Sequence, residues 1–171
     1  MKQLPLFSES EAQPGTGPGV IWHLFVDGAS RNNPGIAGAG VCILKNEIPA
    51  YRRGFFLGKW TNNQAEYLAL LVGLFYVRKH INKEDLLIVV SDSELLIKQM
   101  KGIYRVKDLC LKQFVEIAKK LLPPVDDSYK FIHVLREKNS EADAMANRGI
   151  DKKVSLPVEF IKFMRSYGIE L

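Results

Sequence analysis

Hydrophobic and polar positions alternate with two different periods along this chain, and the two periods separate strands from helices. Residues 21–28, 37–45 and 47–58 are short apolar-rich runs separated by short turns, which predicts three strands in an antiparallel meander. From Asn63 to about His80, the large apolar side chains recur at helical spacing, which predicts a helix that packs on the core. Residues 85–92 are almost continuously apolar, as in a central strand covered on both faces.

The second half of the chain is predicted to be mostly helical. Helices are expected at residues 94–100, 108–122 and 141–148, with a last strand at 129–135. The tail holds one more amphipathic pattern, at Val158, Ile161, Phe163 and Met164. This order predicts an α/β fold with a mixed five-stranded sheet, three antiparallel strands followed by parallel ones, flanked by helices.

The composition divides the chain into three parts. Residues 1–20 are rich in Pro, Gly and Ser towards their end and are expected to form a flexible peptide and linker. Residues 21–150 are expected to form the folded domain, and residues 151–171 a helical tail. No apolar run has the length of a membrane span or a signal peptide, so a cytoplasmic location is expected. Cys42 and Cys110 lack partners at ligand spacing, which argues against structural zinc and a disulfide framework.

The net charge of +5 over 171 residues is weak evidence for an anionic partner by itself, but the distribution of charged residues along the chain is more informative. Residues 21–149 hold 19 Lys and Arg against 14 Asp and Glu, and four of these acids are candidates for one site. The surface around that site would then be strongly basic. A basic surface around an acidic pocket suits a polyanion that is cut with the help of metal ions.

Four acidic residues each have an ordinary structural reading. Asp27 stands in an Asp-Gly pair at the end of an apolar run, which is typical of a turn. Glu66 and Asp143 each stand fourth in a tetrad that resembles a capping box, and Asp92 follows a strand where an N-cap is expected. Taken singly, these residues do not require a functional explanation.

The combination of the four acids predicts a metal site. If the strands before Asp27 and Asp92 are parallel neighbours, the two carboxylates meet at one edge of the sheet, where open α/β sheets bind ligands. The first turn of the long helix can bring Glu66 to the same edge, and Asp143 follows the last strand. A set of carboxylates without His or Cys favours Mg²⁺ or Mn²⁺, and two such ions would suit phosphodiester hydrolysis.

Four segments of the chain resemble, in order and spacing, the four motifs of type 1 ribonuclease H, also called ribonuclease HI. They are residues 25–40, 61–71, 89–100 and 136–147, and the resemblance extends from about Trp22 to Arg148. It implies the ribonuclease H fold and endonucleolytic cleavage of the RNA strand of RNA–DNA hybrids, leaving 3′-hydroxyl and 5′-phosphate ends. It also implies that two Mg²⁺ or Mn²⁺ ions are held by Asp27, Glu66, Asp92 and Asp143, which would be the catalytic residues.

The resemblance also suggests residues that contact the substrate. Asn33, Asn62 and Asn63 match positions at which the family contacts the minor groove of the hybrid, and Thr61 lies near the position of its DNA-phosphate pocket. Amide side chains can both donate to and accept from the 2′-hydroxyl groups displayed in that groove. Asn62 and Asn63 are also ordinary residues for a helix start.

Two features depart from the common family pattern. Many members carry a His in a loop before the last Asp, whereas here a shortened loop offers Arg136, and His133 is expected to lie within the strand. Arg136 can bind phosphate but cannot shuttle protons. The segment at 101–112 is also too short for the basic protrusion with which some members hold the hybrid, and Tyr104, Arg105 and Lys107 either replace it in part or form a solvated charged run.

The N-terminal residues Gln3, Leu4, Pro5, Leu6 and Phe7 form a compact apolar cluster ahead of the linker. They resemble the short peptide by which bacterial replication and repair proteins bind the sliding clamp, with Leu6 and Phe7 in an apolar pocket. The alternative is an ordinary terminal segment without a partner.

The sequence therefore predicts a monomeric, cytoplasmic ribonuclease H that removes primer or R-loop RNA. Two other functions remain open at this point. One is a non-catalytic module that binds hybrids or double-stranded RNA, and the other is a relaxed nuclease that also cuts double-stranded RNA.

Overall fold

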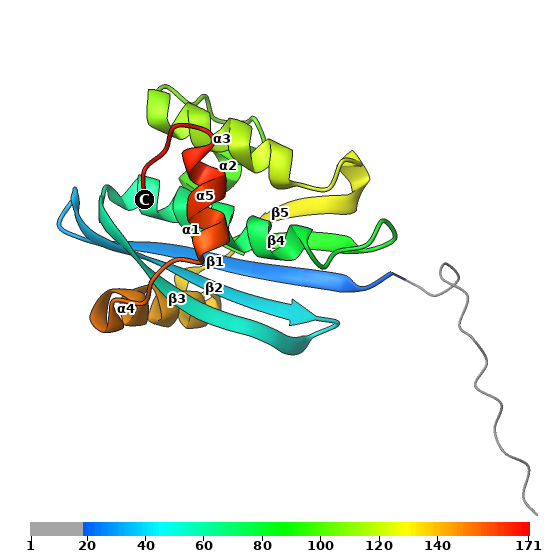
Figure 1. The fold of residues 1–171 in the computed structure, drawn as a ribbon. Helices are drawn as coiled ribbons and strands as arrows, with labels where there is room; N and C mark the ends of the chain where they lie inside the picture. The colour runs from blue at the N-terminus through cyan, green and yellow to red at the C-terminus, as the bar shows by residue number, and fades with distance from the viewer. Residues whose placement is uncertain (1–18) are drawn as a thin grey trace, which may run out of the picture.

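The structure of the protein, a computed structural model, describes residues 19–171 and contains a five-stranded sheet with the strand order β3-β2-β1-β4-β5 (Figure 1). Three long strands form the antiparallel part, and two shorter strands continue the sheet in parallel with β1. These strands are β1 (Ile21–Arg31), β2 (Gly35–Lys45), β3 (Ile48–Trp60), β4 (Leu86–Ser91) and β5 (Tyr129–His133). The predicted fold class, a mixed sheet with three antiparallel and then parallel strands, is confirmed.

Helices cover both faces of the sheet. In Figure 1, α1, α2, α3 and α5 lie on one face, and α4 lies on the other, against β2 and β3. Their bounds are α1 (Asn62–Arg78), α2 (Glu94–Met100), α3 (Leu109–Leu121), α4 (Ser140–Lys152) and α5 (Val158–Arg165). None of the helices within residues 19–171 is long and apolar enough to cross a membrane.

The sequence placed the end of the first strand too early. The expected Asp-Gly turn does not form at Asp27, because Asp27 and Gly28 pair with Gly40 and Ala39 of β2 and the strand continues to Arg31. The helix predicted at residues 141–148 is also longer, since α4 runs to Lys152 before Lys153 adopts a left-handed conformation. Asp27 therefore lies within a strand that is paired with β2 before and after it.

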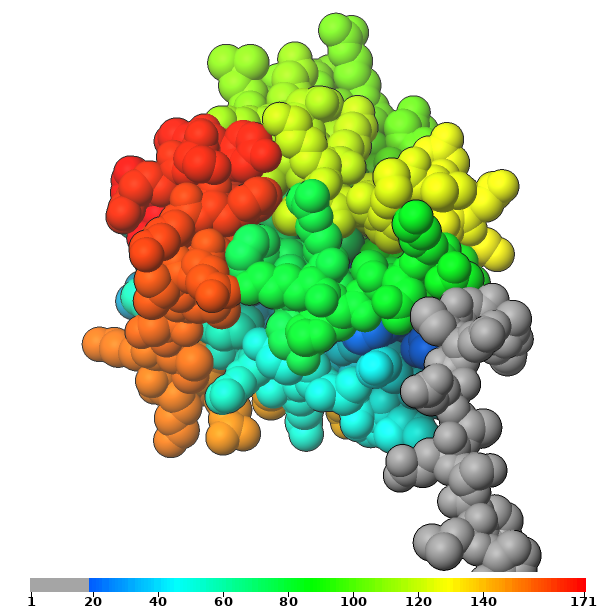
Figure 2. All heavy atoms as spheres, turned by 45° about the vertical axis from the view of Figure 1, so that its right-hand side comes forward, coloured from blue at the N-terminus to red at the C-terminus, as the bar shows by residue number. Residues whose placement is uncertain are grey.

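The C-terminal segment packs against α1. Phe160 and Met164 of α5 are fully buried, and the ring of Phe160 meets that of Phe75 edge-on at 5.5 Å between centroids. Figure 2 shows this segment, in red, beside α1 in green and α3 in yellow-green. Leu156 and Ile169 belong to the same buried cluster, so residues 156–169 contribute to the main core.

The backbones of α1 and α4 approach the sheet closely at two glycines. A Cβ atom at Gly28 would lie 2.2 Å from the backbone nitrogen of Glu66, and one at Gly40 would lie 1.9 Å from the backbone oxygen of Ala142. Only glycine permits backbone-to-backbone contact of this kind. Because Asp27 precedes Gly28 and pairs with Gly40, both helices reach the sheet beside this carboxylate.

Candidate active site

The parallel pairing of β1 with β4 brings two acidic residues together. Phe25 pairs with Val90, and Asp27 and Asp92 stand two positions further along the chain from these two residues. Asp92 follows directly after the last residue of β4. The expectation that two parallel strands bring these carboxylates to one edge is therefore confirmed in its geometry, although Asp27 lies within its strand rather than at its end.

The first turns of α1 carry Glu66 to the same edge. The sequence suggested a capping box that ends at Glu66, but the box is formed by Thr61 and Gln64. The Thr61 hydroxyl accepts the Gln64 backbone N–H at 3.2 Å, and the Gln64 side chain accepts the Thr61 backbone N–H at 3.0 Å. Glu66 is therefore not used to cap the helix, and it accepts a hydrogen bond from the Asn62 side chain at 3.3 Å.

The suggested capping roles of Asp92 and Asp143 are also wrong. Ser93 is the N-cap of α2, and its hydroxyl accepts the backbone N–H of Leu96 at 3.2 Å. Asn139 precedes α4, with no side-chain capping bond, so Asp143 completes no capping box. In all three helices, neighbouring residues occupy the caps, and the acidic side chains remain available to the site.

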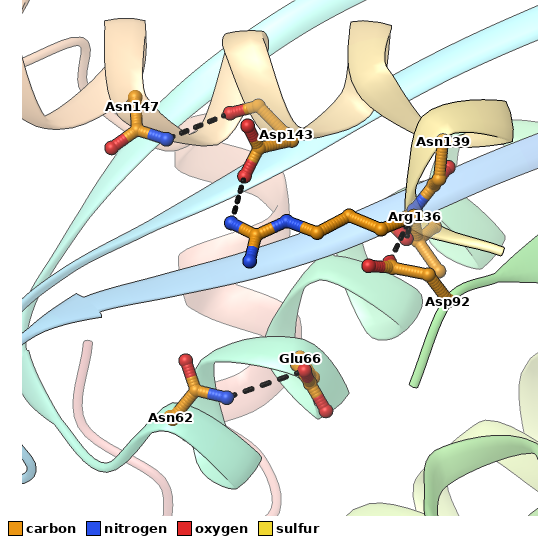
Figure 3. Close-up of polar contacts among 8 residues, drawn as sticks. Asn62, Glu66, Asp92, Arg136, Asn139, Asp143 and Asn147 are labelled. Atoms are coloured by element: carbon orange, nitrogen blue, oxygen red, sulfur yellow. Dashed lines mark hydrogen bonds and ion pairs between the residues drawn. The ribbon is translucent and has the colours of Figure 1, made fainter. Parts of the chain in front are cut away.

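The four carboxylates line one cavity of about 320 Å³, whose wall is mostly polar. Asn62, Asn147 and Arg136 line the same cavity, and the Arg136 guanidinium lies 3.6 Å from the Asp143 carboxylate (Figure 3). The lining residues are Asp27, Gly28, Ala29, Ser30, Arg31, Asn62, Glu66, Asp92, Arg136, Asp143 and Asn147.

Burial and neighbouring negative charges raise the pKa values of two carboxyl groups in this site. Burial, followed by the nearby charges of Asp92 and Asp143, raises the pKa of Asp27 to about 8. The pKa of Glu66 rises to about 7, mainly through burial, which outweighs the lowering effect of hydrogen bonds from Ser93 and Asn62. Clustered carboxylates behave in this way when no cation balances them. The cavity is therefore suited to bind positive charge.

The carboxylates line this cavity, but their oxygens do not converge on one position for a metal ion. Within residues 19–171, no three His, Cys, Asp or Glu side chains converge as a ready set of metal ligands. Asp143 contacts Arg136, and Asp92 accepts a hydrogen bond from Asn139 (Figure 3).

Asn139 is a site residue that sequence reasoning missed. Its side chain is 2% exposed, and its Nδ2 group donates to the Val26 carbonyl at 3.0 Å and to the Asp92 carboxylate at 2.8 Å. The only signal in the sequence was an Asn before a helix start, which suggests an N-cap. Instead, the side chain turns inward and ties the end of β4 to β1, so Asn139 acts as a positioning residue for Asp92.

Comparisons with known proteins show which family the chain resembles. Residues 25–149 match the protein family described as reverse transcriptase-like. Ribonuclease HI of Halobacterium salinarum is 36% identical over 140 residues, which cover 81% of this chain and 68% of that protein. The chain belongs to the ribonuclease HI family.

Solved structures of ribonuclease HI proteins share the fold. The RNase H1 of the same archaeon superposes with a TM-score of 0.71 at 35% identity, covering 77% of this chain and 98% of the other. LC11-RNase H1 was solved in complex with an RNA/DNA hybrid and matches with a TM-score of 0.67 at 35% identity, covering 78% and 97%. The N-terminal RNase H domain of a Mycobacterium tuberculosis protein matches with a TM-score of 0.71 at 31% identity, covering 77% and 100%.

Some of the predicted substrate-contact residues lie at or beside the carboxylate cavity, and others lie away from it. Asn62 and Arg136 line the carboxylate cavity. Asn33 accepts the Asn62 backbone N–H at 3.0 Å, which fixes it beside the start of α1. Thr61 is the N-cap of the same helix, and Asn63 is exposed in its first turn.

Tyr104 and Lys107 do not reach the carboxylate cavity. Tyr104 is 42% exposed, and it lines a separate hollow beside Met100 and Lys112. Lys107 is exposed in the segment between α2 and α3. The peptide residues Gln3, Leu4, Leu6 and Phe7 lie outside the described residues.

His133 belongs to β5 as predicted, but the strand ends at this residue rather than at 135, and its side chain is exposed. Its Nε2 atom lies 3.3 Å from the backbone oxygen of Asp92. His133 therefore lies beside the backbone of Asp92, one of the four carboxylate residues of the site.

We expect Asn139→Ala to lower both stability and turnover. The substitution leaves the buried Val26 carbonyl without its donor, which costs about 1–3 kcal/mol in the free energy of unfolding. It also frees the Asp92 carboxylate, so kcat for hybrid cleavage should fall while KM changes little. Thermal denaturation and steady-state kinetics measure the two effects.

Asn147→Ala is the matched control, because Asn147 lies on α4, the helix that Asn139 precedes, lines the cavity and donates its side-chain hydrogen bond to the backbone oxygen of Asp143 rather than to a carboxylate. It should alter kcat less than Asn139→Ala. A folded Asn139→Ala protein with the wild-type kcat would show that Asn139 does not position Asp92.

Proposed function

We propose that this protein is an endoribonuclease that hydrolyses the RNA strand of RNA–DNA hybrids and leaves 3′-hydroxyl and 5′-phosphate ends. The observation that carries the proposal is the meeting of Asp27, Glu66, Asp92 and Asp143 in one polar cavity of a ribonuclease HI chain. The relative that was solved with an RNA/DNA hybrid supports the choice of substrate. The proposed cellular role is the removal of primer or R-loop RNA by a cytoplasmic monomer.

The proposal includes two Mg²⁺ or Mn²⁺ ions held by the four carboxylates. The residues present fit such ions, because every candidate ligand is a hard oxygen. Burial, together with the neighbouring carboxylates, raises the pKa values of Asp27 and Glu66, so a cation in the cavity would be favoured. When bound, divalent ions supply an activated water and stabilise charge on the leaving oxygen.

The surrounding side chains would bind and orient the hybrid. Arg136 lines the cavity with a side chain that is 80% exposed, and its fixed charge suits a substrate phosphate rather than proton transfer. Asn33 uses its oxygen to accept the Asn62 backbone N–H, which leaves its amide hydrogens as the group that can donate to a 2′-hydroxyl. Asn62 and Asn63 would extend this minor-groove contact, and Thr61 would face the DNA phosphates. Tyr104 and Lys107 would meet the hybrid only beyond the cavity.

The proposed activity is tested by offering three labelled substrates, an RNA–DNA hybrid, an RNA duplex and a DNA duplex, with Mg²⁺ or with EDTA. The wild-type protein should cut only the RNA strand of the hybrid, and only with Mg²⁺. Asp27→Asn should fold and bind the hybrid but reduce cleavage to background, because it removes a ligand and a negative charge beside the phosphates.

Asp126→Asn serves as the control, because Asp126 is exposed and does not line the cavity. It should cut the hybrid at the wild-type rate. Equal cleavage of the RNA duplex would indicate a relaxed nuclease, and binding of the hybrid without cleavage would indicate a non-catalytic module.

A second proposal concerns the peptide at Gln3, Leu4, Leu6 and Phe7, which we infer binds a bacterial sliding clamp. Its support is the sequence resemblance alone. The double substitution Leu6→Ala and Phe7→Ala should abolish binding in a calorimetric titration against the clamp, while cleavage of free hybrid stays unchanged. Absence of binding by the wild-type protein would refute the assignment.

A further inference from the structure

A second cationic cavity lies where α4 meets the edge of the sheet. It has a volume of about 190 Å³ and holds four cationic side chains but no acidic one. Figure 2 shows the segment that contains α4, in orange, beside the β2–β3 segment, in cyan. The lining residues are Arg52, Arg53, Gly54, Met145, Arg148, Lys152 and Val154, and we call this cavity the basic groove.

The basic groove is built by close packing of two backbones. β3 is an edge strand, and a Cβ atom at Gly54 would lie 1.8 Å from the backbone oxygen of Met145. With the backbones in contact there, Arg52 and Arg53 of the strand and Arg148 and Lys152 of the helix border one hollow. The helical spacing of four between Arg148 and Lys152 puts both on the same flank of α4.

The positive charge of the basic groove is poorly balanced. Arg52 forms an ion pair with Glu141, but the distance is 3.9 Å and both side chains are largely exposed. No ion pair within 4.0 Å joins Arg53, Arg148 or Lys152 to an acid among residues 19–171. Clustered like charges repel one another and attract a polyanion.

Some of the cations in the basic groove also have an ordinary structural explanation. A cation near the C-terminus of α4 complements the helix dipole, which accounts for Lys152. Charged residues on an edge strand oppose edge-to-edge aggregation, which accounts for Arg52 or Arg53. Neither explains why strand and helix direct their cations at the same cavity.

The basic groove is separate from the carboxylate cavity. The two cavities share no lining residue. Asp143 and Arg148 are five residues apart on α4, which corresponds to about 140° around the helix at 3.6 residues per turn. Asp143 and Arg148 therefore face different sides of α4. A nucleic acid that reaches both cavities must bend around the helix, which a flexible single strand does more readily than a stiff duplex.

We propose that the basic groove binds the phosphodiester backbone of a single strand that extends from the hybrid in the active site. The inference rests on the proposed function for the position of the hybrid. The guanidinium groups of Arg52, Arg53 and Arg148 suit phosphate oxygens, which they bind through two parallel hydrogen bonds. No aromatic residue lines the groove, so bases do not stack there and binding is independent of sequence.

The test compares a blunt hybrid with the same hybrid carrying a single-stranded DNA extension. Binding is followed by fluorescence anisotropy in EDTA over a range of salt concentrations. Each phosphate neutralised on a single strand contributes about 0.7 to the slope of log K against log salt concentration. If three cations engage the extension, it should steepen the wild-type slope by about 2.

The groove variant carries Arg53→Ala, Arg148→Ala and Lys152→Ala. It should lose the added slope while cutting the blunt hybrid at the wild-type rate. The control variant, Lys83→Ala with Lys130→Ala and Lys162→Ala, removes the same charge at exposed sites outside the groove and should keep the added slope. If the triple variant does not fold, Arg148→Ala alone should lose about 0.7 of the slope.

The result that would overturn the proposal is an extension without effect on wild-type binding, or an equal loss in the groove and control variants. A titration with inorganic phosphate tests whether the groove is instead a site for a small anion. In that case phosphate would protect the wild-type protein and the control variant, but not the groove variant, from thermal unfolding. If the extension also had no effect on binding, this result would overturn the proposal. Cleavage of the blunt hybrid by the wild-type protein reports the proposed function separately. If that cleavage fails, binding of the free single strand by the wild-type and groove variants still decides the assignment of the groove.

Discussion

Close contact between helix backbones and the sheet is the constraint on which the site depends. Gly28 lets the first turns of α1 lie directly on β1, and Gly40 lets α4 lie on β2 from the opposite face. Asp27 precedes the first glycine and pairs with the second, so both helices reach the sheet beside it. A side chain at either glycine would force one helix away and separate the carboxylates that the two helices carry.

This packing brings carboxylates close together in a partly buried place, which is electrostatically unfavourable. Burial and the neighbouring carboxylates raise the pKa of Asp27 to about 8, so the cavity favours protons or cations. Arg136 approaches Asp143 from a short loop, and Asn139 holds Asp92 by a buried hydrogen bond. The folded chain therefore maintains an arrangement that like charges oppose, and it concentrates negative charge in the part of the molecule where divalent cations would act.

The order of strands and helices could be predicted from the sequence because their hydrophobic periods are distinct, and the site could be located because its acids occur in recognisable motifs. The limits arose where local rules competed with tertiary contacts. The Asp-Gly pair at Asp27 suggested a turn, but pairing with β2 keeps it extended. The cap of α1 was assigned to Glu66 instead of Thr61 and Gln64. The inward turn of Asn139 depends on an acceptor 113 residues away, Val26, which local sequence cannot reveal.

The fold brings the four carboxylates together around Asp27 in one cavity. An NMR titration of the Asp27 side-chain carboxyl carbon in the metal-free protein tests it most directly. We expect a midpoint at about 8, which should fall in Asp92→Asn, because that substitution removes a neighbouring negative charge. A midpoint near the ordinary aspartate value of about 3.9, unchanged by Asp92→Asn, would contradict it.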